Sequence, residues 1–318
     1  MNASATFNVR VVARTREADD IVSLELASVD GTPLPPFSAG AHIDVVLRTG
    51  LVRQYSLCND PSERHRYLIA VLRDSHSRGG SQAIHDDVAV GDTLAISAPK
   101  NHFPLVPATR YLLLAGGIGV TPILCMAERL ANAGANFDMH YCTRTPERTA
   151  FRQRIMASPF AERVRFHFDA TGDRLDIDAA LRAVPADTHM YVCGPAGFID
   201  AVISTAKALE WDSERVHTEY FGAALQDGAD QPFEVRVAST GCTYAVPAGH
   251  SVVQILAKHG VDVPVSCEQG VCGTCLTRVL DGTPDHRDHY LTDEEQAAND
   301  QFTPCCSRAK TPLLVLDL

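Results

Sequence analysis

Short runs of alternating apolar and polar residues fill the first third of the chain. Residues 7–12, 21–26 and 42–47 are examples, and turn residues such as Gly31 and Gly40 separate such runs. A period of two is typical of strands that bury one face. Many short strands with frequent turns predict a closed β-barrel or a sandwich rather than a parallel sheet.

The pattern changes near residue 110. Residues 111–115 form a continuous apolar run, a glycine-rich turn follows at 116–122, and a helical pattern extends to about residue 132. An apolar strand, a glycine turn and a helix make a βα unit of a parallel sheet. Residues 137–142 and 189–193 read as further strands of the same kind. Ligands of such sheets collect at the carboxyl ends of the strands.

A polar segment at residues 223–232 reads as a linker. Beyond it, a hairpin is expected at 233–237 and 242–246, a short amphipathic helix at 251–259 and a strand at 276–280. This order of elements is that of a β-grasp fold. A chain of 318 residues is also longer than one hydrophobic core usually supports, so several domains are expected.

Composition excludes some classes of function. The formal net charge of −11 argues against nucleic acid as a partner, because phosphate neutralisation needs a basic surface. Residues 1–7 lack the basic and apolar regions of a signal peptide, and no apolar run is long enough to span a bilayer. We therefore expect a cytoplasmic protein with no membrane partner.

Three thiols dominate the last third. Cys267, Cys272 and Cys275 have the C-x4-C-x2-C spacing of a plant-type 2Fe–2S site, in which a short loop wraps one side of a compact cluster. Gly270 and Gly273 allow positive φ, which brings backbone N–H groups near the sulfurs. The thiols available to complete the set are those at positions 305 and 306.

Zinc and disulfides are the alternatives for these cysteines. A zinc ribbon normally has two C-x2-C knuckles, whereas the first gap here is four residues. Ten cysteines in a long chain without a signal peptide fit a reducing compartment better than a disulfide framework. An iron–sulfur cluster is the leading prediction. His286 and His289 are read as part of a solvated loop rather than as a metal site.

Two segments of the first third have the chemistry of an anion and heterocycle site. In the strand R-Q-Y-S, Arg53 and Tyr55 share one face, and Gln54 and Ser56 share the other. The guanidinium offers forked donors to a phosphate, and the ring offers a flat surface to a planar heterocycle. Residues 78–84 read as a glycine turn that opens a helix, whose N–H groups would hold a phosphate.

With these motifs the chain resembles the ferredoxin–NADP reductase superfamily, and within it the phthalate dioxygenase reductase group, which includes vanillate demethylase reductases. The resemblance implies an antiparallel β-barrel domain for FMN at residues 1–106, an α/β parallel-sheet domain for NADH at 107–225, and a β-grasp ferredoxin domain at 226–318. FMN is favoured over FAD because no aromatic residue stands out for an adenylate. The flavin contacts implied are Arg53, Gln54, Tyr55, Ser56, Ala70, Leu72, Arg78, Gly79, Gly80 and Ser81.

The resemblance also covers G-G-I-G-V-T-P and C-G-P. The nucleotide contacts it implies are Gly116, Gly117, Gly119, Thr121, Thr143, Arg144, Cys193, Gly194 and Pro195. Thr121 and Phe221 are expected beside the flavin, and Cys193 beside the nicotinamide. Arg144 and Arg148 could hold the 2′-phosphate of NADPH, but Asp169 and Asp173 are placed to accept from a ribose hydroxyl. Together with the preference of the family, this favours NADH.

The ending C-x-S-R-A of the family aligns Cys305 with the fourth cluster ligand. Cys306 departs from that pattern, and adjacent side chains of an extended chain face opposite ways. The predicted ligands are therefore Cys267, Cys272, Cys275 and Cys305.

These parts predict an electron-transfer enzyme. A nicotinamide delivers two electrons as hydride and a 2Fe–2S cluster accepts one at a time, so a flavin is expected between them. No acid–base residue is required. The resemblance implies the oxygenase component of a Rieske-type dioxygenase or demethylase as the acceptor, and the acidic charge would suit a basic docking patch. The alternative is a redox-sensing or carrier module without sustained turnover.

Overall fold

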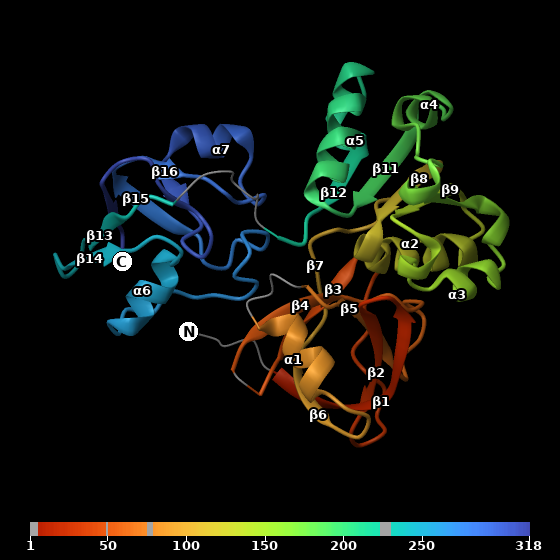
Figure 1. Ribbon diagram of the computed structural model, residues 1–318, viewed down its shortest axis with the longest axis horizontal. Coiled ribbons are helices and arrows are strands. Elements are labelled where there is room, and N and C mark those ends of the chain that lie inside the picture. Colours follow the sequence, from red (N-terminus) through yellow and green to blue (C-terminus); the bar gives the residue numbers. More distant parts are fainter. Residues whose placement is uncertain (1–5, 49, 75–78, 223–229) are drawn as a thin grey trace. The chain divides into compact units, whose positions relative to one another are not determined.

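The computed structural model describes residues 6–48, 50–74, 79–222 and 230–318, and its chain divides into two units, Met1–Glu219 and Tyr220–Leu318. The first unit contains an antiparallel sheet and a parallel sheet, and the second contains a mixed sheet (Figure 1). The predicted limits at residues 225 and 226 lie outside the described residues. The three-part division therefore stays a prediction.

The antiparallel sheet has the strand order β4-β3-β6-β1-β2-β5, with β7 paired to β3. A bridge between Leu57, just after β4, and Ile69 of β5 joins the two ends of this order. The sheet is therefore closed into the predicted barrel. The elements of the barrel are β1 (Thr6–Ala18), β2 (Ile21–Ser28), β3 (Ala41–Val46), β4 (Val52–Ser56), β5 (Tyr67–Leu72), α1 (Gly80–Asp87), β6 (Thr93–Ser97) and β7 (Lys100–Asn101).

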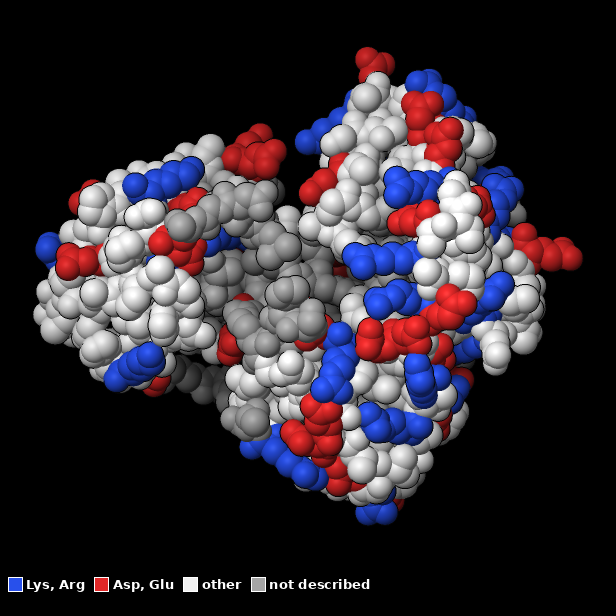
Figure 2. Space-filling model, viewed as in Figure 1, with Lys and Arg blue, Asp and Glu red and all other residues white. Residues whose placement is uncertain are grey.

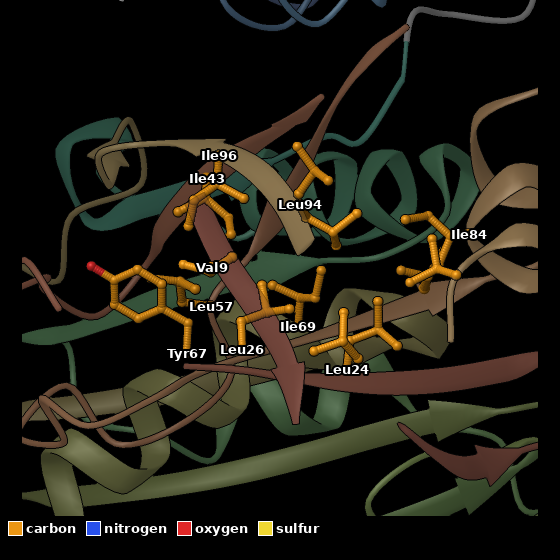
Figure 3. Close-up of a cluster of buried hydrophobic side chains, with 14 of the residues drawn as sticks. Val9, Leu24, Leu26, Ile43, Leu57, Tyr67, Ile69, Ile84, Leu94 and Ile96 are labelled. Carbon is orange, nitrogen blue, oxygen red and sulfur yellow. The ribbon is translucent and has the colours of Figure 1, made fainter. Parts of the chain in front are cut away.

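Apolar residues of alternating strand positions fill the barrel. Val9, Leu24, Ile43 and Ile96 come from four different strands and are fully buried in one cluster (Figure 3). Ile84 of α1 belongs to the same cluster, so the helix closes one end of the core. The position of α1 is consequently fixed relative to the strands.

The parallel sheet has the order β10-β9-β8-β11-β12. The chain starts in the middle at β8, adds β9 and β10 on one side, and then adds β11 and β12 on the other. This reversal creates a topological switch point between the carboxyl ends of β8 and β11. The elements are β8 (Arg110–Gly116), α2 (Val120–Asn132), β9 (Asn136–Thr143), α3 (Arg152–Met156), β10 (Val164–Phe168), α4 (Ile177–Arg182), β11 (Thr188–Cys193), α5 (Ala196–Ala208) and β12 (Val216–Glu219).

The second unit has the mixed sheet order β14-β13-β19-β15-β17, in which β13 and β19 are parallel and their outer neighbours are antiparallel. The helix α6 begins with a capping box formed by Ser251 and Gln254. These features confirm the predicted β-grasp fold. The elements are β13 (Phe233–Val237), β14 (Thr243–Val246), α6 (Val252–Lys258), β15 (Thr277–Asp281), β16 (Pro284–Asp285), α7 (Asp293–Ala298), β17 (Gln301–Phe302), β18 (Arg308–Ala309) and β19 (Leu313–Leu316).

No helix among the described residues is long and apolar enough to cross a bilayer. On the face drawn in Figure 2, basic and acidic side chains are interleaved.

Two histidine pairs link neighbouring strands of the parallel sheet. Nδ1 of His140 on β9 lies 2.9 Å from Nε2 of His167 on β10, and the two rings are stacked. His189 and His217 form the same contact between β11 and β12, at 3.0 Å. Burial, and secondarily the neighbouring His167, lowers the pKa of His140 to about 4. Burial also lowers the pKa of His167 and of His217.

A histidine whose pKa is lower in the folded state makes the protein less stable as the pH falls, because the unfolded chain binds the proton at a higher pH than the folded one. Its contribution is complete above the ordinary value of 6.5 and is lost as the pH falls from there toward about 4. When the pH is lowered from 7.5 to 5, the free energy of unfolding of the parent should decrease. In the His140→Gln/His167→Gln double variant we expect that decrease to be smaller by about 1–2 kcal/mol. Urea unfolding followed by the fluorescence of Trp211, the single tryptophan, measures this in the parallel-sheet part. Equal losses in both proteins would contradict the assignment.

Candidate functional site

The predicted anion site of the barrel is formed by β4 and α1. The side chain of Arg53 is buried and runs along Gly80, where an added Cβ would lie 2.6 Å from Nε of Arg53. Gly79 has φ of 85°, a left-handed conformation, and starts α1 without a side-chain cap. The guanidinium and the first N–H groups of α1 therefore lie together, as an anion site requires.

Other residues of the predicted flavin site lie on adjoining strands. Gln54 donates its amide to Asp44, on the face opposite Arg53, and Asp44 also accepts from Lys100 at 2.6 Å. Tyr55 packs against the core of the barrel, and burial raises its pKa to about 12. It therefore remains a neutral phenol at physiological pH.

Ser56 and Ala70 are buried near the bridge that closes the barrel, and Leu72 ends β5. The hydroxyl of Ser81 accepts from the backbone N–H of Asp74 at 3.1 Å, so this residue also fixes the chain that leaves β5. Arg78 lies outside the described residues.

At the switch point, glycines let two backbone segments touch. A Cβ on Gly119 would collide with the backbone of Cys193 and Gly194. A Cβ on Gly116 would lie 2.9 Å from both Pro195 and Phe198. The predicted G-G-I-G and C-G-P motifs are thus brought into contact, whereas Gly117, with φ of 54°, has open space beside it.

The remaining predicted nucleotide residues are distributed along the same edge of the sheet. Thr121 is buried in the first turn of α2 and donates to the carbonyl of Ile118. The hydroxyl of Thr143 lies 2.8 Å from that of Thr149, so it points into the protein rather than toward an open site. This explains its burial and leaves its backbone as the part available to a ligand.

Arg144 and Asp169 follow neighbouring strands and are joined through the backbone. The N–H of Ala170 donates to the carbonyl of Arg144 at 2.9 Å. The Asp169 carboxylate is half-exposed and lies 3.6 Å from Arg174. Arg144 and Asp169 thus directly follow the carboxyl ends of the neighbouring strands β9 and β10.

The four predicted cluster thiols meet in the second unit. Cys267 contacts Cys272 and Cys305, and Cys305 also contacts Cys275. The N–H of Gln269 donates to the sulfur of Cys267 at 3.3 Å. Hydrogen bonds from Cys272 and Cys305, together with backbone N–H groups, lower the pKa of Cys267, which favours its thiolate. No three His, Cys, Asp or Glu side chains in the described part of the chain are gathered for a single metal ion.

The loop takes its shape from positive φ angles at Glu268, Gly270 and Gly273. A Cβ on Gly270 would collide with the sulfur of Cys306, and one on Gly273 would collide with the ring of Tyr290. Cys306 also contacts Cys305, Thr303 and Ser307. Cys305 contacts Cys267 and Cys275, whereas the contacts of the Cys306 sulfur are with Cys305, Thr303, Ser307 and the space beside Gly270.

The loop with His286 and His289 was wrongly read as solvated. The side chain of His286 is 7% exposed and lies 3.7 Å from the fully buried carboxylate of Asp288. Asp288 accepts from the backbone N–H groups of Tyr290 and Leu291, which folds the loop back onto the domain. The polar sequence of this segment gave no sign that it is buried, because the residues that cover it lie elsewhere in the chain.

Comparison with known proteins shows the family to which the chain belongs. Residues 235–310 match the 2Fe–2S iron–sulfur cluster binding domain. Vanillate O-demethylase oxidoreductase of Pseudomonas putida is 58% identical over 97% of this chain and 98% of that protein. Phthalate dioxygenase reductase of Burkholderia cepacia is 42% identical over 98% and 97%. A solved phthalate dioxygenase reductase, described as modular for electron transfer from pyridine nucleotides to 2Fe–2S, superimposes with a TM-score of 0.84 at 40% identity, covering 99% and 98%.

The chain belongs to this family of oxygenase reductases. Membership confirms the predicted fold class and the prediction of an NADH-dependent flavin iron–sulfur oxidoreductase, and it favours that activity over a sensor or carrier module. It also supports the cofactor set of FMN, NADH and a 2Fe–2S cluster.

The structure adds one residue of the reductase that the sequence did not single out. Glu219 ends β12 in register with Cys193, beside the switch point. The residue is half-buried, but Oε2 of its carboxyl is shielded from solvent and has no hydrogen-bond partner among the described residues. Burial raises its pKa to about 8, so at neutral pH it is an uncharged acid next to the thiol of Cys193. Its place at the end of the last strand of the parallel sheet was the available sequence signal.

A carboxyl whose pKa rises on folding loses stability in base. The folded state keeps the proton of Glu219 up to about pH 8, whereas the unfolded chain releases it near 4.5, so its contribution declines between those values. We compare the free energy of unfolding of Glu219→Gln with that of the parent. The difference between them should shift in favour of the variant by on the order of 2 kcal/mol when the pH is raised from 5.5 to 8.5. Urea unfolding of the reductase measured through Trp211 tests this. The exposed Glu214→Gln should show no such gain, and a gain in both variants would refute the assignment.

Proposed function

We propose that this chain is the reductase component of a Rieske-type oxygenase that demethylates a methoxylated aromatic acid such as vanillate. The observation that carries the proposal is the 58% identity to a vanillate O-demethylase oxidoreductase over nearly the whole of both chains. The described sites supply the binding chemistry that such a component needs. A cytoplasmic location is part of the proposal, since all ten cysteines are free of disulfides.

The flavin-binding role is assigned to residues of β4, β5 and the start of α1. Arg53 and the N–H groups of α1 bind the phosphate of FMN, and Ser81 holds the turn beside it. Tyr55 offers an aromatic face to the ring, with Gln54 and Ser56 on the same strand. Ala70 and Leu72 supply backbone contacts, and Arg78 completes the phosphate site. The support is the contact of Arg53 with Gly80 and the uncapped start of α1.

The nucleotide-binding role is assigned to the switch point. Gly116, Gly117 and Gly119 let the backbone approach the pyrophosphate, and Gly194 and Pro195 form the opposing wall. Thr143 contributes its backbone, and Arg144 and Asp169 bind the ribose region of NADH. The support is the close backbone packing of the two motifs.

Residues at the reacting end exclude water and fix orientation. Cys193 is fully buried, and Glu219 beside it is uncharged, so the surface proposed to face the nicotinamide carries no fixed charge from these two residues. Thr121 is buried in the adjacent turn, and Phe221 follows Glu219 by two residues. FMN, when bound, supplies the conversion of a two-electron donor into two one-electron steps. No acid–base residue of the chain is required for this reaction.

The acceptor is proposed to dock on the second unit. Residues 220–318 contain thirteen Asp and Glu against six Lys and Arg, so a basic oxygenase surface would be attracted. Tyr290 and Leu276 are 46% and 37% exposed, and both lie against Gly273 of the cluster loop. Exposed apolar groups beside the electron exit suit a transient protein contact.

Reconstitution tests the proposed function. The purified holoprotein with NADH, dioxygen, vanillate and a vanillate demethylase oxygenase component should consume vanillate and release one formaldehyde for each NADH oxidised. The same mixture without this chain is the control. Rapid NADH-dependent reduction of cytochrome c without any vanillate turnover would retain the reductase class and refute the partner.

The choice of fourth ligand is tested by single substitutions. Cys305→Ser is expected to lose most of the iron, the acid-labile sulfide and the visible iron–sulfur absorption, because its sulfur meets those of Cys267 and Cys275. Cys306→Ser should keep all three, because its sulfur contacts Cys305, Thr303 and Ser307 but is not paired with Cys267 or Cys275 in the contacts of the described residues. Cluster loss in the Cys306 variant alone would reverse the assignment.

A further inference from the structure

The first residue of the second unit is fastened by an aromatic stack. The rings of Tyr220 and His289 are 3.7 Å apart between centroids and 5° from parallel. Tyr220 is bonded directly to Glu219, the last residue of β12. The stack therefore holds the chain at the residue where it leaves the nucleotide-binding sheet.

His289 is in turn held against the cluster loop. Its backbone N–H donates to the carbonyl of Gly270 at 3.0 Å, and Gly270 lies between Cys267 and Cys272. The buried carboxylate of Asp288 accepts hydrogen bonds from the backbone N–H groups of Tyr290 and Leu291. It also accepts one from the hydroxyl of Ser307. The ring of His289 thus has little freedom relative to the loop.

The far end of the polar segment is also fastened to the second unit. Asp230 lies 2.8 Å from Arg287 and 3.6 Å from Arg308, and it accepts from the N–H of Gly249. Arg308 donates to three backbone carbonyls of the same unit. The residues described on either side of segment 223–229 therefore both contact the cluster unit. The division between the two units lies at Glu219 and Tyr220, before this segment.

We propose that the Tyr220–His289 stack, and not the polar segment at 223–232, is the joint that governs electron transfer from the flavin to the cluster. Electron transfer weakens steeply with distance, so its rate depends on how often the two cofactors are held close. With the stack in place, the chain is fastened to the cluster unit at Tyr220, directly after Glu219. Without the stack, the next contact described above that fastens the chain to the cluster unit is that of Asp230, and the arrangement competent for electron transfer is populated less.

Tyr220 and His289 are positioning residues in this proposal, which rests on the proposed function of the chain as a flavin-to-cluster reductase. Neither is assigned to the binding of FMN, NADH or the cluster. Their loss should leave the first half of the reaction, reduction of the flavin by NADH, unchanged.

Stopped-flow absorbance of the holoprotein separates the two halves. After mixing with NADH without oxygen, Tyr220→Leu should reduce the flavin at the parent rate but the cluster about three- to tenfold more slowly, because the energy of an aromatic pair corresponds to a factor of that size. Tyr220→Phe keeps the ring and should restore the parent rate. A Gly-Ser-Gly-Ser insertion between Gln226 and Asp227 should also leave both rates unchanged.

A second readout does not depend on turnover. Hydrogen exchange at residues 286–291 should be faster in Tyr220→Leu than in Tyr220→Phe, because the ring that covers His289 is gone. Iron content and reduction by dithionite should match the parent in all variants, which confirms that the cluster is intact.

The outcomes are distinguishable. If the parent itself does not reduce its cluster with NADH, the proposed function fails. If the parent does and Tyr220→Leu matches it, or if Tyr220→Phe is as slow as Tyr220→Leu, the stack is not the joint. If the insertion slows cluster reduction as much as Tyr220→Leu does, the polar segment governs transfer and the proposal is overturned.

Discussion

The second unit depends on a loop that turns three thiols toward a fourth. Unrestrained thiols have no reason to gather, because each loses solvation and chain freedom when it is buried. Positive φ at Glu268, Gly270 and Gly273 bends the backbone so that Cys267, Cys272 and Cys275 point to one side. The fourth thiol, that of Cys305, comes from a distant segment just before the short strand β18. The surrounding core, including Phe302 and Leu314, holds these segments in register.

The first unit solves a different problem, which is how to approach a ligand closely with backbone alone. At the switch point, Gly119 and Gly194 allow two turns to touch, so N–H groups rather than side chains form the wall. The barrel uses a helix start and one buried arginine in place of a glycine pair. Both sites favour anions, but each is built from a different combination of backbone and charge.

The strands and the motif positions could be predicted from local patterns. Alternation in β1, β2 and β3, the apolar run of β8 and the spacing of Cys267, Cys272 and Cys275 each carry their signal within a few residues. The features that were missed depend on partners far apart in the chain. Burial of His286, the shielded carboxyl of Glu219 and the pairing of His140 with His167 arise only when separate strands and loops meet. The hydrophobic periodicity of the sequence carries no information on contacts between such distant segments.

The sulfur of Cys306 occupies the space beside Gly270 where any larger residue would place its Cβ. Gly270 therefore cannot be enlarged while the sulfur of Cys306 remains beside it. A cluster loop transplanted from a reductase with a side chain at the position of Gly270 would be rejected here unless residue 306 were made smaller in the same step. Engineers who recombine ferredoxin domains should treat the pair as a single inherited unit.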